Sequence, residues 1–238
     1  MSAETDEVAR RVEGIGGWLT PREGRLLYDL ARRCTGRGVI VEIGSWKGKS
    51  TIWMASGSRR GAGVKVHAID PHTAESDNLA TQSAVPTLEE FTRNIRSAGL
   101  DDLVVPLVTT SAEAASHFSH PVELIFIDGA HDYASVALDL DLWFSKVVDG
   151  GTIAFHDTVA WEGPRRLVAE RVFRGGWARG ARFVDSTTVA EKVAGNSIGD
   201  RLRNRYVLGL KQIGDAGSRL QAPAIVRATG RRILERLF

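Results

Sequence analysis

Short apolar runs alternate with stretches of helical character along most of this chain of 238 residues. The runs have the length of buried strands and lack the polar alternation of a half-exposed sheet, so they are typical of parallel strands covered on both faces. The pattern therefore predicts an α/β, Rossmann-like, doubly wound sheet with helices on both faces. The parallel strand candidates are Val39–Ile43, Val64–Ile69, Leu103–Val108, Leu124–Ile127 and Thr152–Phe155.

Two further runs, Ala181–Val184 and Thr187–Val193, predict a terminal antiparallel pair, which makes seven strands in all. The helix predicted over Ser135–Val147 is expected to bury five apolar side chains and to end at Gly150–Gly151. These five are Val136, Leu138, Leu140, Leu142 and Trp143. The other helices are predicted over Lys49–Ser56, after Thr87, near Ser111 and over Pro164–Phe173.

The chain divides into three parts by this pattern: an N-terminal helical segment over 1–37, the α/β domain over 38–193 and a C-terminal helical extension over 194–238. The end of the extension, Ile225–Phe238, is amphipathic and basic. Three interpretations stay open for it: a helix packed on a partner subunit or on its own domain, a lid over the active site, or a helix at a membrane surface. The long polar loop before Thr87 is predicted to be functional or mobile.

Composition excludes several classes of function. The net charge is only +2 and no block of lysine or arginine stands in the core region, so no nucleic-acid partner is predicted. The single cysteine, Cys34, excludes an internal disulfide and fits a reducing compartment. The polar N-terminus has no signal-peptide pattern, and no segment approaches the ~20 apolar residues needed to span a bilayer. We therefore expect a cytoplasmic protein without stable membrane insertion.

A glycine loop, VEIGSWKGKST at 41–51, follows the first predicted strand. Gly44 leaves room for a close backbone approach, and the helix after Gly48 offers free N–H groups to an anion such as a carboxylate. Glu42, at the end of the strand, is expected either to orient the loop or to receive a cofactor ammonium group. The loop therefore predicts a cofactor pocket at the carboxyl ends of the strands.

The type of cofactor follows from two further features. Asp70 ends the second strand 22 positions after Gly48, where an acidic residue can accept hydrogen bonds from ribose hydroxyls. Trp46 and Lys49 occupy the second and third glycine positions of the dinucleotide fingerprint, and the indole would hinder a pyrophosphate. A nucleoside cofactor without phosphates is favoured over NAD. The alternative is a tight turn with a capping aspartate.

With these motifs the chain resembles the class I S-adenosylmethionine-dependent methyltransferases over roughly residues 15–193. The similar segments are VEIGSWKGKST, HAIDPH, TSAEAA, IDGAHDY and GGTIAFHD. Within the class it looks most like the metal-dependent O-methyltransferases that act on sugar hydroxyls of macrolides, including actinobacterial methylmannose polysaccharide enzymes. The resemblance implies S-adenosyl-L-methionine as cofactor. The predicted contact residues are Glu42, Gly44, Ser45, Gly48, Ser50, Asp70, His72, Ser111, Ala112 and Asp128.

Acidic side chains end the fourth and fifth strands, which are neighbours in the fold that the chain resembles. Parallel neighbours lie about 4.8 Å apart, so Asp128 and Asp157 are predicted to share a divalent metal. The alternative is that both only cap strands or helices. His156 is predicted as a third ligand, with a histidine bonded to backbone as the alternative. Mg²⁺ is the expected ion and Mn²⁺ also fits an imidazole ligand.

His131 lies three residues after Asp128, where the sugar O-methyltransferases that the chain resembles carry a histidine base and the catechol-type enzymes a lysine. An unperturbed imidazole has a pKa of about 6.5 and can accept a proton at neutral pH. Bringing an alcohol from ~15.7 to neutrality corresponds to ~12 kcal/mol, whereas a general base supplies about 3–5 kcal/mol. The base and the metal are therefore expected to act together. The alternative for His131 is a surface helix-cap histidine.

These features predict an S-adenosylmethionine-dependent, metal-dependent O-methyltransferase that modifies a hydroxyl of a small-molecule or oligosaccharide acceptor, such as a methylmannose polysaccharide precursor. The alternatives are a catechol-type enzyme, a noncatalytic cofactor-binding protein and a metal-dependent hydrolase or hydroxylase. A homodimer is expected. Trp18, Trp46 and Trp161 are candidates for stacking on a sugar or adenine, with core or interface packing as the alternative.

Overall fold

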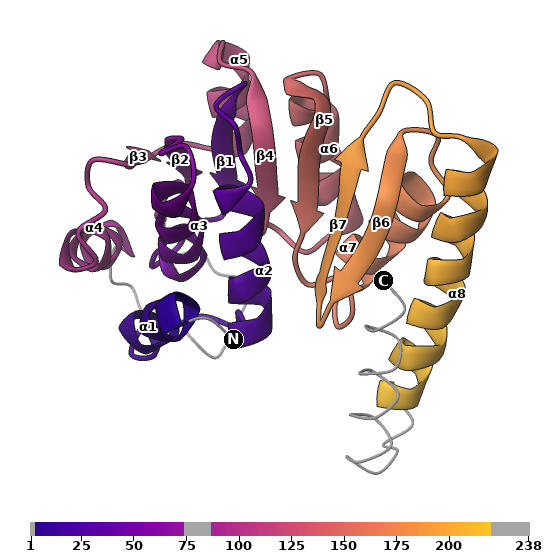
Figure 1. Ribbon diagram of the computed structural model, residues 1–238, viewed down its shortest axis with the longest axis horizontal. Helices are drawn as coiled ribbons and strands as arrows, with labels where there is room; N and C mark the ends of the chain where they lie inside the picture. Colours follow the sequence, from indigo (N-terminus) through magenta and orange to yellow (C-terminus); the bar gives the residue numbers. More distant parts are fainter. Residues whose placement is uncertain (1–2, 74–86, 220–238) are drawn as a thin grey trace.

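The computed structural model describes residues 3–73 and 87–219. Its centre is a seven-stranded sheet in the order β3-β2-β1-β4-β5-β7-β6, in which β7 runs antiparallel to both of its neighbours (Figure 1). The strands are β1 (Val39–Ile43), β2 (Val66–Ile69), β3 (Val104–Leu107), β4 (Val122–Ile127), β5 (Val147–Phe155), β6 (Ala178–Val184) and β7 (Thr187–Lys192). The predicted α/β class, the parallel core and the terminal antiparallel pair are confirmed.

Helices cover both faces of the sheet, with α2 and α3 on one side and α6 and α7 on the other (Figure 1). The described helices are α1 (Ala3–Val12), α2 (Pro21–Arg32), α3 (Lys49–Arg60), α4 (Thr87–Ser97), α5 (Ser111–His117), α6 (Tyr133–Phe144), α7 (Glu162–Leu167), the π-helix η2 (Val168–Phe173) and α8 (Ile198–Arg219). The helix predicted over Pro164–Phe173 is thus an α-helical turn that passes directly into a π-helix.

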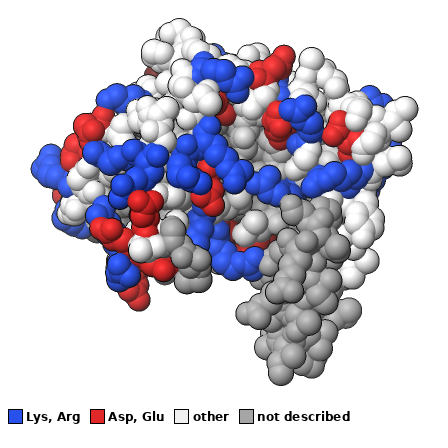
Figure 2. Space-filling view, in the orientation of Figure 1, with Lys and Arg blue, Asp and Glu red and all other residues white. Residues whose placement is uncertain are grey.

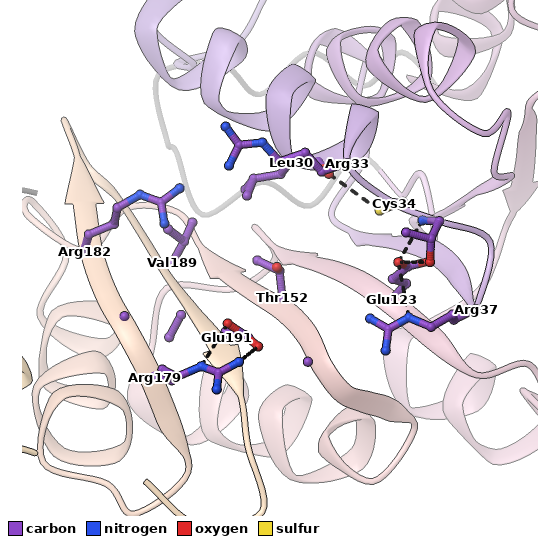
Figure 3. A pocket seen from close by; sticks show the side chains of 14 residues that line it. Leu30, Arg33, Cys34, Arg37, Glu123, Thr152, Arg179, Arg182, Val189 and Glu191 are labelled. Atoms are coloured by element: carbon purple, nitrogen blue, oxygen red, sulfur yellow. Dashed lines mark hydrogen bonds and ion pairs between the residues drawn. The ribbon is translucent and has the colours of Figure 1, made fainter. Parts of the chain in front are cut away.

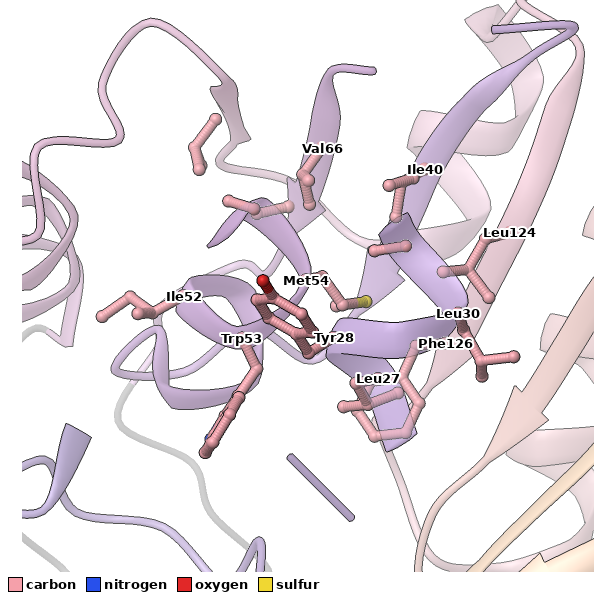
Figure 4. Close-up of a cluster of buried hydrophobic side chains, with 14 of the residues drawn as sticks. Leu27, Tyr28, Leu30, Ile40, Ile52, Trp53, Met54, Val66, Leu124 and Phe126 are labelled. Carbon is pink, nitrogen blue, oxygen red and sulfur yellow. The ribbon is translucent and has the colours of Figure 1, made fainter. Parts of the chain in front are cut away.

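Alternation along the strands divides the core into two hydrophobic clusters. Ile40 and Phe126 belong to the cluster under α2 and α3, whereas Val41 and Ile125 belong to the cluster under α6 and α7. Figure 4 shows the first cluster, in which helical side chains such as Leu27 and Met54 lie towards Phe126 of β4. Because β4 is buried along its whole length, its sequence contains no polar alternation.

The N-terminal helices are part of this core, since Val8 of α1 and Leu27 of α2 belong to the first cluster. At the other end of the chain, α8 packs Val207 and Leu208 into the second cluster. The basic segment Ile225–Phe238 lies outside the described residues. In the described ranges, no helix combines the length and the apolar character needed to cross a membrane.

The boundary between α6 and β5 differs from the prediction. The helix ends at Phe144, and Val147, predicted as its last residue, begins β5 and pairs with Val122. Gly150 has φ +78 and lies inside the strand, where the pairing with β4 shifts register, so the two glycines form a bulge instead of ending a helix. The predicted burial of Leu138 is also wrong: it is 51% exposed, because it lies on the outer side of α6.

Candidate active site

The candidate site lies at the carboxyl ends of β1, β4 and β5. The chain leaves β1 towards β2 on one side and leaves β4 towards β5 on the other, so the strand order reverses between β1 and β4. Open α/β sheets bind ligands at such a switch point. The glycine loop and the acidic residues predicted from the sequence both end here, which brings the two predicted parts of the site to one edge.

Gly44 allows the end of β1 to lie against the backbone at the end of β4, and its contact with a cofactor stays a prediction. It has φ +86, and a Cβ added to it would lie 2.1 Å from the carbonyl oxygen of Asp128. The Asp128 N–H donates to the Ile43 carbonyl at 2.9 Å. The glycine thus allows β1 to approach the backbone that carries Asp128.

Glu42 is completely buried at the end of β1. Its two carboxyl oxygens accept hydrogen bonds from the hydroxyls of Ser50 and Thr51 in α3. Burial raises the pKa of Glu42 to about 8, against these two hydrogen bonds, which lower it. These contacts correspond to the first of the two predicted roles, because they tie the start of α3 to the strand and so orient the loop between them.

Asp70 organises the turns that follow β1 and β2. Its carboxylate accepts the Trp46 N–H at 2.8 Å and the His72 N–H at 2.7 Å. Trp46 and His72 have positive φ values of 40° and 50°, and the neighbouring Gly48, at φ +85, is the N-cap of α3. Backbone in this sparsely populated region collects at functional sites, where surrounding contacts hold it in place.

Two buried polar atoms at this edge have no hydrogen-bond partner in the described structure. They are the Oγ of Ser45, which is 2% exposed, and the Nε2 of His72, which is 6% exposed. The other ring nitrogen of His72 pairs with the Thr87 hydroxyl at 2.9 Å. Burial lowers the pKa of His72, although Asp70 counteracts it. Buried polar atoms are nearly always hydrogen-bonded, so these two are suited to a polar ligand.

Ser111 and Ala112, the predicted adenine contacts, begin α5 after Thr110, which is its N-cap. The Ser111 hydroxyl accepts a hydrogen bond from the Trp143 indole at 3.0 Å and also bonds with Asp139. Ala112 is exposed. The serine side chain is thus held by α6, and the start of α5 follows β3 at the same edge of the sheet as Asp70.

The acid and imidazole cluster is formed by residues that follow β4 and β5. Asp128, His131 and Asp157 each offer one ligand atom, and these atoms lie within 4.8 Å of one another. His131 Nε2 is 2.9 Å from Asp157 Oδ2. Asp157 has φ +56, which turns its side chain out of the line of the strand. The structure therefore brings both predicted carboxylates and the predicted base together.

His156 lies beneath the two carboxylates and is 4% exposed. Its Nδ1 is 3.0 Å from Asp128 Oδ1 and 3.5 Å from Asp157 Oδ2, and its Nε2 is 3.5 Å from Glu23 Oε1. Both ring nitrogens thus face carboxylates. The role of His156 as a metal ligand stays a prediction, since its Nδ1 already faces Asp128.

The charges of the cluster follow from burial and from these contacts. Burial raises the pKa of Asp128, although His156 counteracts it. Burial disfavours ionisation of Asp157 as well, but hydrogen bonds with His131 and His156 lower its pKa well below its ordinary value. Burial also opposes the charge of His156, yet the surrounding carboxylates, Asp128 first, raise its pKa well above the ordinary value. The pKa shifts of Asp157 and His156 thus run in opposite directions, because each group favours the charged form of the other.

The contacts that Glu23 and Lys211 make at the site could not be predicted from the sequence. Glu23 forms a capping box with Thr20, and the spacing of these two residues could have indicated it. Nothing in the sequence links Glu23 to His156, or to the Ser186 N–H, from which it accepts a hydrogen bond at 2.9 Å. The buried Lys211 of α8 donates to the Thr158 carbonyl at 2.7 Å, one residue after Asp157. Helices at both ends of the chain thus support the end of β5.

The candidate tryptophans stack on other rings of the chain. Trp18 and Trp46 are parallel, with centroids 5.2 Å apart, and Trp161 stacks on His131 at 4.4 Å. Trp18 is nevertheless 59% exposed. The Trp161 contact fixes the plane of the imidazole, so this indole positions the predicted base.

Residues 41–158 match the model of a family described as a methyltransferase domain. The matched segment begins in β1 and ends one residue after Asp157, so it contains the glycine loop, Asp70 and the acid cluster. It covers just under half of the chain. The predicted enzyme class, a methyltransferase, is confirmed at this level.

Solved structures with this fold include several O-methyltransferases. A protein of Corynebacterium glutamicum is 17% identical, with a TM-score of 0.59 over 82% of this chain and 92% of its own. The O-methyltransferase NovP is 20% identical, with a TM-score of 0.58 over 72% of this chain and 80% of its own. The O-methyltransferase of Bacillus cereus in complex with SAH is 19% identical, with a TM-score of 0.54 over 81% and 92%. At these identities the similarity establishes the fold.

Proposed function

We propose that the protein is an S-adenosylmethionine-dependent O-methyltransferase that uses a divalent metal and modifies a sugar or glycoside hydroxyl. The observation that carries the proposal is the meeting of His131, Asp128 and Asp157 at the switch point, with His131 Nε2 2.9 Å from Asp157 Oδ2. A proton acceptor and two carboxylates thus stand beside a cofactor loop, which is what methylation of a weakly acidic hydroxyl requires.

The residues around the glycine loop fit the proposed cofactor. The unpartnered Ser45 hydroxyl and His72 Nε2 are buried polar atoms that a nucleoside and an amino acid moiety can satisfy. Asp70 ends β2 beside the loop and retains lone pairs for ribose hydroxyls. When bound, S-adenosylmethionine supplies an electrophilic methyl group on its sulfonium sulfur. The Bacillus cereus structure, a complex with SAH, supports this donor, and both it and NovP are described as O-methyltransferases, which supports transfer to oxygen.

His131 is the proposed general base. Nε2 donates its hydrogen to the ionised Asp157 carboxylate, so the ring nitrogen that would accept the proton of the acceptor hydroxyl is Nδ1. The acceptor oxygen takes the methyl group and S-adenosylhomocysteine leaves. The imidazolium that forms is then stabilised by the ionised Asp157 carboxylate. Stacking on Trp161 holds the ring in this orientation. Such positioning lets the base act without reorganisation.

The donor set fits a hard or borderline divalent cation. Asp128 and Asp157 would hold the ion through carboxylate oxygens, and His156, whose Nδ1 is 3.0 Å from Asp128 Oδ1, stays the predicted third ligand. When bound, the cation lowers the pKa of a coordinated hydroxyl and so reduces the demand on the base. The raised pKa of Asp128 fits this role, because a buried carboxylate near a second carboxylate is stabilised by an added positive charge.

The acceptor is the least constrained part of the proposal. A sugar hydroxyl ionises near ~15.7 and needs both a base and a cation, whereas a phenol at ~10 needs much less help. His131 can act as the base, and the two carboxylates can hold the cation. A catechol-type acceptor, which needs less help, is the second candidate, since the same two carboxylates could hold a cation beside it. The predicted homodimer and cytoplasmic location stay predictions.

The test combines binding and turnover. We would titrate S-adenosylhomocysteine by calorimetry with and without Mg²⁺ or Mn²⁺, and then assay methyl transfer to partly methylated sugars and to catechols. His131→Ala should lower kcat about 10²–10⁴-fold while leaving the affinity for S-adenosylhomocysteine within about twofold. His117→Ala, an exposed histidine at the end of α5, is the matched control and should not change kcat.

Asp128→Asn should weaken metal binding, so this variant should need a higher metal concentration than the wild type for the same activity. Activity that survives both chelation and His131→Ala would refute the proposed mechanism. If catechols are methylated and sugars are not, the acceptor assignment is wrong and the chemistry stands.

A further inference from the structure

A cavity of about 270 Å³ lies at the other end of the sheet from the candidate active site. It opens between the C-terminal end of α2 and strands β4, β5, β7 and β6, on the face that α2 covers (Figure 3). Glu123, near the amino end of β4, and Glu191, at the far end of the antiparallel β7, mark its position. None of the residues assigned to the methyl-transfer site lines it, so the cavity needs a separate explanation.

Four arginines line this cavity together with two glutamates. Each glutamate is already engaged. Glu123 accepts hydrogen bonds from the Thr35 N–H at 2.8 Å, from its hydroxyl at 2.9 Å and from the Gly36 N–H at 3.0 Å, and it lies 3.8 Å from Arg37. Glu191 forms an ion pair with Arg179. The two acids are thus occupied by the loop before β1 and by the neighbouring strand.

The side chains of the other two arginines, Arg33 and Arg182, have no hydrogen bond or acidic partner in the described part of the chain. Figure 3 shows them on facing walls, Arg33 at the end of α2 and Arg182 on β6. Four cations and two anions leave an excess of two positive charges around the cavity. Burial and the nearby charges of Arg33 and Arg203 lower the pKa of Arg182, so this guanidinium lies in an environment that lacks negative charge.

The surface around the opening is also basic. Figure 2 shows lysine and arginine side chains in a band across the face on which β7 and β6 lie in front. An opening surrounded by one sign of charge concentrates ions of the other sign. The exposed Arg33 therefore stands where an anion would enter, and the half-buried Arg182 stands deeper in the wall.

We propose that this cavity binds the phosphate group of a small phosphorylated molecule between Arg33 and Arg182. A phosphomonoester carries between one and two negative charges at neutral pH, which matches the excess of the pocket. Planar guanidinium groups bind phosphate oxygens through paired N–H donors, and Arg is preferred where this fork is used. The volume is near the lower end of small-molecule sites, so a large cofactor does not fit.

The experiment is a calorimetric titration of the full chain with inorganic phosphate and with a hexose phosphate, at constant ionic strength. We expect saturable binding at one site. Arg182→Gln and Arg33→Gln should each weaken it at least about tenfold, which corresponds to about 1.4 kcal/mol per arginine. The control is Arg10→Gln, since Arg10 is exposed on α1 and does not line the cavity; it should change the affinity less than about twofold.

The two ligands distinguish the source of the phosphate. Tighter binding of the hexose phosphate supports the proposal of a phosphorylated molecule, whereas equal affinities overturn it in favour of a free anion. Equal losses in the Arg10 and Arg182 variants, or no saturation at about 10 mM, also overturn it. Arg33 is exposed, so its variant keeps the test valid if Arg182→Gln fails to fold. S-adenosylhomocysteine affinity, measured on the same variants, should not change.

Discussion

Substitution of Gly44 by alanine should be among the most damaging single-methyl changes in the protein. The added Cβ would lie 2.1 Å from the carbonyl oxygen of Asp128, and the backbone has φ +86. The left-handed conformation costs an alanine about 1–2 kcal/mol, and relief of an overpacked contact costs about 1–3 kcal/mol. We expect a loss of about 2–5 kcal/mol in the free energy of unfolding, because β1 and the end of β4 must separate.

Gly63→Ala provides the matched control. Gly63 has φ +67, and a Cβ added there meets no atom within 4 Å. This variant should lose only the conformational part, about 1–2 kcal/mol. The difference between the two variants therefore isolates the contact between Gly44 and Asp128, and urea denaturation followed by circular dichroism measures it as a change in midpoint at constant slope.

The Gly44 substitution should also displace Asp128 from the cluster. In calorimetry, Gly44→Ala should weaken metal and S-adenosylhomocysteine binding, and Gly63→Ala should leave both unchanged. Equal unfolding free energies for the two variants would show that the end of β1 can move away from Asp128 without strain, and the reasoning about this contact would be wrong.

Three further results are expected. Burial would raise the pKa of the Glu23 carboxylate, but contacts with His156 lower it from 4.5 to about 2, so ionised Glu23 contributes about 3 kcal/mol to the free energy of unfolding above pH 4.5. This contribution is lost as the pH falls through about 2. Glu23→Gln should abolish this part of the pH dependence of stability, and parallel stability profiles for the variant and the wild type would contradict the assignment. Leu140→Ala should destabilise by about 2–5 kcal/mol and Leu138→Ala by less than about 0.5 kcal/mol, since only the first is buried; similar losses in urea denaturation would contradict the assigned face of α6. Burial raises the pKa of the Cys34 thiol to about 12, so iodoacetamide should label it only after unfolding, and rapid labelling of the native protein at pH 8 would contradict its burial.

Local patterns were sufficient for the strands that are buried on both faces. β1 has the predicted bounds Val39–Ile43, and β4 extends its predicted range by only two residues. Local patterns were insufficient at the start of β5. Val147 continues the apolar pattern of α6, and yet it pairs with Val122 in the sheet. A helix and a buried strand can share such a sequence, and only pairing with a neighbouring strand distinguishes them.

The same distinction applies to the candidate site. Asp128, His131 and Asp157 follow predictable strands, so their arrival at one edge followed from the resemblance and from the geometry of parallel strands. The environment of His156 could not be predicted in this way, because Glu23 lies 133 positions earlier in the chain and contacts the ring from the side opposite to the carboxylates. Its prediction as a metal ligand, with a histidine bonded to backbone as the alternative, did not include the contact with Glu23.

The sequence by itself determined where most strands lie, which chemical groups end them and that a glycine loop precedes α3, because these depend on periodicity and on residue type over a few positions. Tertiary structure alone decided that Gly44 serves the approach to Asp128, that Glu23 pairs with His156 and that Arg33 and Arg182 face one cavity. These contacts join residues far apart in the chain, and their distances are set by strand order and helix packing, which local patterns do not encode.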